Sequence, residues 1–94
     1  MGEALVRVRA VVHGRVQMVG FRAFVIQHAG DVGLSGTVRN EPDGTVEAVL
    51  EGPRLAVERI LDLLRQGPSH AQVERVDVEY LAPIGRLPAM MVAR

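Results

Sequence analysis

The residues best suited to chemistry form one run near the N-terminus, where two glycines enclose a short loop and an arginine follows. The run reads Gly14-Arg15-Val16-Gln17-Met18-Val19-Gly20-Phe21-Arg22. It joins a segment of strand-like alternation to one of helical periodicity, so its backbone amides are expected to converge beside a helix N-terminus. The guanidinium of Arg22 adds a permanent charge whose fork of donors fits a phosphate. The run therefore predicts recognition of a phosphate group.

The composition limits the classes of protein that can carry this run. With 94 residues, the chain is expected to form a single domain over residues 1–94. Its formal net charge of +0 argues against a large basic surface for nucleic acid or anionic lipid. The absence of cysteine excludes disulfides, thiolate metal sites and cysteine nucleophiles. The sequence shows no membrane span and no signal-peptide pattern, so we expect a cytoplasmic protein without membrane partners. We also expect a monomer without nucleic-acid partners.

The elements that must position the loop are predicted by hydrophobic periodicity. Alternating apolar residues indicate strands, and apolar residues three and four apart indicate helices. The predicted strands cover residues 5–13, 34–40, 45–51, 73–81 and 89–92, and the predicted helices cover residues 21–32 and 52–66. Pro42, Asp43 and Gly44 have the turn chemistry expected between the second and third strands. We interpret Met90 and Met91 as residues that fill an edge strand.

The order of the first six of these elements, βαββαβ, predicts the fold. Each helix must cover an apolar sheet face, and crossover connections are right-handed. The compact solution is an α+β, ferredoxin-like sandwich with an antiparallel sheet and two helices on one face. The first and third strands are then central neighbours, so Arg7 and Arg9 are expected to meet Glu47 and Glu51 on the open face. We interpret these four charges as a solvated surface of little energetic weight. In this topology, Asn40 and the loop at residues 14–20 lie at the same edge of the sheet.

Two separate motifs resemble those of the acylphosphatase family. The run from Gly14 to Arg22 resembles the family's loop, G-x-V-Q-G-V-x-F-R. The segment Gly36-Thr37-Val38-Arg39-Asn40, followed by Gly44-Thr45-Val46 and Gly52, resembles its second signature, G-aromatic-V-x-N followed by G-x-V and a later glycine. Two motifs in the right order and at the right separation are more specific than one glycine-rich loop.

The resemblance implies the hydrolysis of acyl phosphates to a carboxylate and inorganic phosphate, without a metal or cofactor. It implies that Arg22 binds the phosphate together with loop amides and that Asn40 orients the attacking water. The residues expected to bind phosphate are Arg15, Val16, Gln17, Met18, Val19, Gly20 and Arg22. For the Arg15 side chain, plain exposure to solvent is the alternative interpretation. Asn40 is also a residue type that commonly begins a turn.

The residue types are consistent with that chemistry. A carboxyl phosphate has a good leaving group, so positioning and charge stabilisation are the main requirements. Arg22 can bind phosphoryl oxygens bidentately. Asn40 is neutral and cannot act as a general base, but its amide can accept from and donate to a water. We expect the proton of the water to pass to the phosphate of the substrate.

Two positions depart from the family pattern. Met18 stands where the family has glycine, and Thr37 stands where it has an aromatic residue. If position 18 requires a positive φ, methionine costs about 1–3 kcal/mol of strain, and its side chain must point out of the loop. Thr37 is expected to alter packing or an apolar wall beside the acyl group.

Other functions compete with this hypothesis. A non-catalytic module that binds phosphate or acyl phosphate on the same fold is the first alternative. An RNA-binding module is disfavoured, because residues 45–51 carry no aromatic side chain for base stacking. A metal site is disfavoured too, because His13, His28 and His70 lack ligand spacing.

Overall fold

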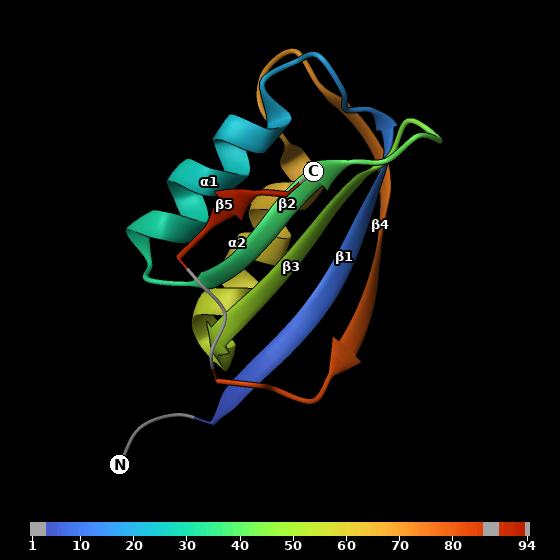
Figure 1. The fold of residues 1–94 in the computed structure, drawn as a ribbon. Helices are drawn as coiled ribbons and strands as arrows, with labels where there is room; N and C mark the ends of the chain where they lie inside the picture. Colours follow the sequence, from blue (N-terminus) through green and yellow to red (C-terminus); the bar gives the residue numbers. More distant parts are fainter. Residues whose placement is uncertain (1–3, 86–88, 94) are drawn as a thin grey trace.

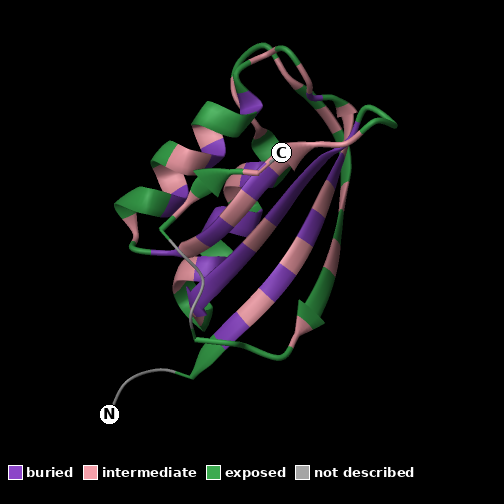
Figure 2. Cartoon of the chain, in the orientation of Figure 1, coloured by how far each residue is buried: buried purple, intermediate pink, exposed green. Residues whose placement is uncertain are grey.

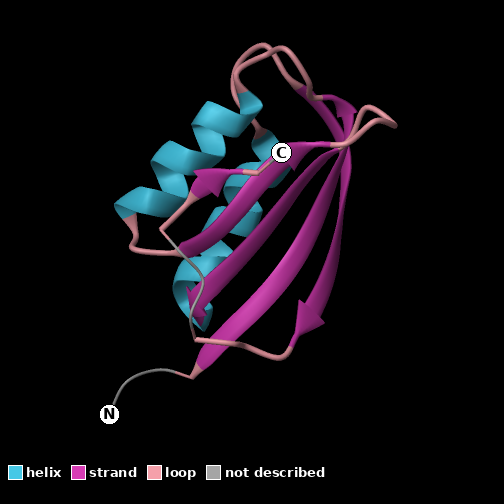
Figure 3. Ribbon diagram, in the orientation of Figure 1, coloured by secondary structure: helices cyan, strands magenta, loops and turns pink. Residues whose placement is uncertain are grey.

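The described residues, 4–85 and 89–93 of this computed structural model, form one sheet with two helices on one face (Figures 1 and 3). The elements in chain order are β1 (Leu5–Arg15), α1 (Phe21–Asp31), β2 (Ser35–Asn40), β3 (Val46–Pro53), α2 (Arg54–Gln66), β4 (Gln72–Leu81) and β5 (Met91–Val92). The predicted ferredoxin-like α+β fold is confirmed. Neither described helix is long and apolar enough to cross a membrane.

The sheet has the strand order β4-β1-β3-β2-β5, with β1 and β3 as antiparallel neighbours inside it. Its four long strands are antiparallel, as predicted, but β5 pairs parallel with β2. The direction of β5 follows from the path of the chain. The end of β4 and the start of β2 lie at the same end of the sheet, because Leu81 and Glu51 both pair with Arg7, and Ser35 pairs with Glu51. A strand that follows β4 and starts beside β2 at this end therefore runs in the same direction as β2, as β5 does.

The core lies between the sheet and the helices (Figure 2). Alternate residues of β1 face it, as the sequence pattern predicts, and α2 adds an apolar stripe. Phe21 is the largest of the fully buried side chains, and the other buried core residues are Val, Leu, Ile and Ala. Its buried members include Val8, Ala10, Val12, Val25, Val38, Leu50, Ile60 and Leu64.

The open face of the sheet differs from the prediction. Glu47 and Glu51 are only 8% and 5% exposed, so the interpretation of these charges as solvated is wrong for both carboxylates. Glu47 lies between two arginines, 2.5 Å from Arg9 Nε and 3.3 Å from Arg39 Nε. Glu51 instead accepts hydrogen bonds from the backbone amides of residues 84 and 85, at 2.9 and 2.6 Å. These contacts exclude water from both carboxylates, and the hydrogen bond from Arg9 to Glu47 raises the pKa of Arg9.

The topology brings the two motif segments to one edge of the sheet. Because β1 and β2 both run antiparallel to β3, they are parallel to each other and end at the same edge. The loop that leaves β1 and the C-terminal residue of β2, Asn40, therefore lie close together, with the N-terminus of α1 beside them (Figure 1).

Candidate functional site

The loop begins at an irregularity in β1. The register between β1 and β4 shifts between His13 and Gly14. Gly14 has φ +126°, and a Cβ atom there would lie 2.1 Å from the backbone oxygen of Gln72. Only glycine fits this close approach, and the resulting bulge lies one residue before β1 ends at Arg15.

The loop itself has the conformation expected of an anion cradle. Val16 is 1% exposed and anchors the loop in the core. Met18 and Gly20 both have left-handed backbone angles, with φ 62° and 79°, and such residues form the concave amide arrangements that bind anions. The backbone amides of residues 16–20 donate no hydrogen bond to any described residue. Their donors are therefore available to a ligand.

Arg22 and Asn40 line the same pocket, which has a volume of about 700 Å³. Arg22 lies in the first turn of α1, exposed and without an ion pair to any described acid. Asn40 ends β2 on the sheet face that carries the helices, and its side chain makes no hydrogen bond to a described residue. Among the described residues lining the pocket, Arg22 is the only charged one. The arrangement can therefore attract one anionic group and hold a polar molecule beside it.

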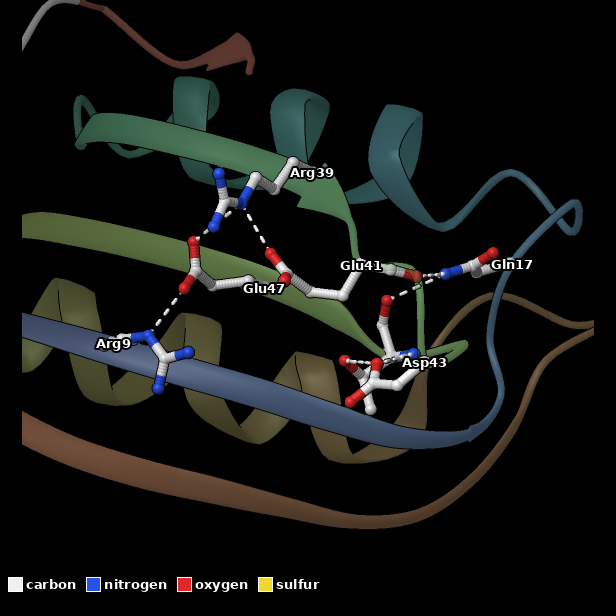
Figure 4. Close-up of polar contacts among 7 residues, drawn as sticks. Arg9, Gln17, Arg39, Glu41, Asp43 and Glu47 are labelled. Carbon is white, nitrogen blue, oxygen red and sulfur yellow. Dashed lines mark hydrogen bonds and ion pairs between the residues drawn. The ribbon is translucent and has the colours of Figure 1, made fainter. Parts of the chain in front are cut away.

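The Gln17 side chain joins the loop to the turn after Asn40 (Figure 4). Its amide nitrogen donates to the backbone oxygens of Glu41 and Thr45, at 2.7 and 2.9 Å. The turn is held from within as well, because the Asp43 carboxylate accepts from the backbone amide and hydroxyl of Thr45. These hydrogen bonds lower the pKa of Asp43. Gln17 thus fixes the position of the loop relative to the end of β2.

Charged side chains brace the strand that presents Asn40 (Figure 4). Arg39, the residue before Asn40, lies 2.5 Å from Glu41 and 3.3 Å from Glu47. Because side chains alternate along β2, Arg39 lies on the sheet face opposite Asn40 and the pocket. Both acids neutralise its charge on that face.

The predicted site residues do not all meet at the pocket. Val16, Met18, Gly20, Arg22 and Asn40 line it. Arg15 is the last residue of β1, where it pairs with Gln72, and its exposed side chain does not line the pocket. Val19 packs against the core. The roles assigned to all these residues stay predictions, both for those that line the pocket and for Arg15, Gln17 and Val19, which do not. The described residues contain no group of three or more His, Asp or Glu side chains placed to hold a metal ion.

Sequence reasoning missed the other walls of the pocket. Ala23, Ile26 and Gln27 of α1 line the pocket beside Arg22, and so do Met91 and Val92 of β5 and Met90 just before it. Of these α1 residues, Ile26 follows from helical spacing, because it lies one turn after Arg22 and shares its face. The interpretation of Met90 and Met91 as filling residues missed the pocket, because nothing local in the sequence shows that β5 pairs with β2 beside α1.

Met18 is the one described non-glycine residue with a positive φ, and its side chain is fully exposed. We expect Met18→Gly to raise the free energy of unfolding by up to about 1.5 kcal/mol. Left-handed strain of about 1–2 kcal/mol is relieved, and the added freedom of glycine in the unfolded chain offsets about 0.4–1 kcal/mol of that. Urea unfolding of Met18→Gly and Met18→Ala tests this. Alanine keeps the strain, so an equal gain in both variants contradicts the explanation.

Comparison with known proteins agrees with the geometry. The Acylphosphatase family matches residues 8–88. An acylphosphatase of Roseiflexus sp. (strain RS-1) is 49% identical over 86% of this chain and 87% of its own. An acylphosphatase of Thermus thermophilus is 53% identical over 79% of this chain and 84% of its own.

The solved structure of acylphosphatase from Bacillus subtilis matches the fold as well. It superposes with a TM-score of 0.91 at 31% identity and covers 95% of this chain and 99% of its own. The family match includes both motif segments, and the two relatives and the solved structure match most of the sequence. This chain belongs to the acylphosphatase family.

Proposed function

We propose that this protein hydrolyses acyl phosphates to a carboxylate and inorganic phosphate, with Arg22 and the loop amides binding the phosphoryl group. The observation that carries the proposal is the shared pocket of Arg22 and Asn40, beside a loop whose amides have no described partner. Family membership supports the same reaction.

In the proposed reaction, the oxygen of a water attacks phosphorus and the bond from phosphorus to the carboxyl oxygen breaks. The carboxylate leaves with the bonding electrons, and the proton of the water passes to an oxygen of the phosphoryl group. Arg22 and the amides stabilise charge on the phosphoryl oxygens as the reaction proceeds. Asn40 holds the water in line, which reduces the entropy lost on reaching the transition state.

The experiment that tests the proposal is the hydrolysis of benzoyl phosphate by the purified protein in the presence of a chelator. We expect multiple turnovers that the chelator does not reduce. If a folded protein gives no turnover, yet inorganic phosphate raises its melting temperature, the chain is a binding module and the proposed hydrolysis is wrong.

Gln17 has a positioning role in this proposal, because its two hydrogen bonds fix the loop relative to Asn40. We expect Gln17→Met to lower the free energy of unfolding by about 1–3 kcal/mol, since two partly buried carbonyls lose a donor. We also expect kcat to fall by about 10-fold or more, because small displacements of positioning groups are costly. The KM should change less, since Arg22 and the loop amides remain. Urea unfolding and steady-state kinetics measure the two effects.

The matched control is Gln66→Met, which changes an exposed glutamine at the end of α2. Both kcat and stability should stay at the wild-type level in this control. An unchanged kcat for Gln17→Met, measured well below its melting temperature, contradicts the positioning role.

The remaining expectations stay predictions. These are a single domain over residues 1–94, a monomer, a cytoplasmic location, and the absence of cofactor, nucleic-acid and membrane partners.

A further inference from the structure

The pocket beside Arg22 and Asn40 is larger than a phosphate requires. Its volume of about 700 Å³ lies in the range of about 300–1,000 Å³ that is typical of pockets for much larger ligands. The phosphoryl group must lie against Arg22 and the loop amides. The space that remains in the pocket is available to the acyl group of the substrate.

Most of the residues that wall that space are apolar, and Gln27 of α1 is the uncharged polar one among them. One wall is α1, through Ala23 and Ile26, and another is the C-terminal strand, through Val92. Val92 is the Cα partner of Val38, and neighbouring residues at one register position share a sheet face. Val38 is fully buried under the helices, and Asn40, two residues further along β2, lies on the same face. Val92 therefore faces the pocket, although 45% of its surface is exposed to solvent.

The rim of the pocket carries Met18. This residue holds a left-handed φ of 62° and exposes its whole side chain, although glycine would adopt that angle without strain. Backbone strain of this kind is concentrated at ligand sites. A flexible, polarizable side chain at the rim can adapt to apolar ligands of different shape. Met18 thus adds apolar surface that a glycine cannot supply.

We propose that this pocket binds the acyl group and selects uncharged, apolar acyl groups, aliphatic or aromatic, over acyl groups that carry a second carboxylate. The inference rests on the proposed hydrolysis. Arg22 is the only charged residue among the described lining residues, and the phosphate occupies it. A second carboxylate in the pocket would lose water without gaining a cation from any described lining residue, which is unfavourable.

Butyryl phosphate and succinyl phosphate form the sharpest substrate pair, because both have four carbons and they differ in the distal group. At pH 7, we expect kcat/KM to be about 10-fold or more higher for butyryl phosphate, since the distal carboxylate of its competitor must lose water. From acetyl to hexanoyl phosphate, we expect a rise of at least about 10-fold, since each methylene removed from water contributes up to about 4-fold.

The variant Val92→Lys places a cation on the apolar wall. We expect the ratio of kcat/KM for succinyl phosphate over butyryl phosphate to rise by about 10-fold or more, the order of a close charge pair. The matched control is Leu55→Lys, which adds the same charge at an exposed leucine of α2 outside this pocket. Long-range attraction of anions acts in both variants, so the ratio should stay at the wild-type value in the control.

The outcomes separate this inference from the proposed function. Turnover of all substrates with equal kcat/KM for butyryl and succinyl phosphate overturns the acyl selectivity and leaves the hydrolysis standing. An unchanged ratio in folded Val92→Lys overturns the position of the acyl group. Absence of turnover on every substrate overturns the hydrolysis and the selectivity together.

Discussion

Arg22→Ala should lower kcat/KM for benzoyl phosphate by about 10³-fold or more, the effect of removing an arginine that stabilises a phosphoryl transition state. That loss corresponds to about 4 kcal/mol of transition-state stabilisation. Arg22 is the only charged residue among the described residues lining the pocket, so none of the other described lining residues can replace it. The affinity for inorganic phosphate, measured as a competitive inhibition constant, should fall as well.

Loss of folding does not explain the expected result. Arg22 is exposed in the first turn of α1, where a positive charge opposes the helix dipole. Its removal should leave the melting temperature unchanged or slightly raised. Thermal unfolding of the variant, monitored by circular dichroism, measures this directly.

Two variants sharpen the test of Arg22. Arg22→Lys keeps the charge but loses the planar fork that binds two oxygens, so it should show most of the loss. Arg59→Ala removes an exposed arginine of α2 outside the pocket and should keep wild-type kinetics. If Arg22→Ala retains more than a tenth of the wild-type kcat/KM, Arg22 does not bind the phosphoryl group.

Asn40→Ala should lower kcat by about 100-fold or more, similar to the loss of one preorganised hydrogen bond at a reacting centre. The inhibition constant of inorganic phosphate should stay close to the wild-type value, because Arg22 and the loop amides remain. The side chain of Asn40 makes no hydrogen bond to a described residue, so stability should change by less than about 0.5 kcal/mol. Steady-state kinetics with phosphate as inhibitor separate the two roles.

Asn40→Asp provides a second measurement of the same position. A carboxylate of the same shape repels the phosphate, so this variant should weaken phosphate binding as well as turnover. Near-full activity of Asn40→Ala, or equal loss of phosphate binding in both variants, contradicts the assignment of Asn40 to the water.

The position of Arg22 and Asn40 at one edge of the sheet could be predicted, because each element that positions them is encoded in a short stretch of sequence. Alternation in β1, the helical stripe of α1 and the turn at residues 41–44 are all local. The βαββαβ order then leaves few topologies, and in the ferredoxin-like one the ends of β1 and β2 share an edge. Strain at Met18 could also be predicted, because the family that the loop resembles has glycine at this position and glycine commonly marks a positive φ.

The features that the sequence did not predict depend on contacts between distant residues. Gln17 reaches carbonyls 24 and 28 residues away, and nothing in its local pattern separates a side-chain contact from a backbone role. Glu47 and Glu51 alternate with apolar residues as solvated charges do, yet Arg9, Arg39 and the segment after β4 cover them. The parallel pairing of β5 follows from the path after β4, which local periodicity does not encode.

The two edge strands of the sheet also affect how the molecule behaves at high concentration. Open strand edges invite another chain to add a strand, and proteins block this with very short edge strands or charged ones. One edge strand of this sheet is β5, which is only two residues long. The other is β4, whose exposed side chains include Glu74, Arg75, Asp77 and Glu79. A second copy would have to pair along a two-residue ladder or align its own charges with these. The same edges that complete the fold therefore disfavour growth of the sheet into fibrils.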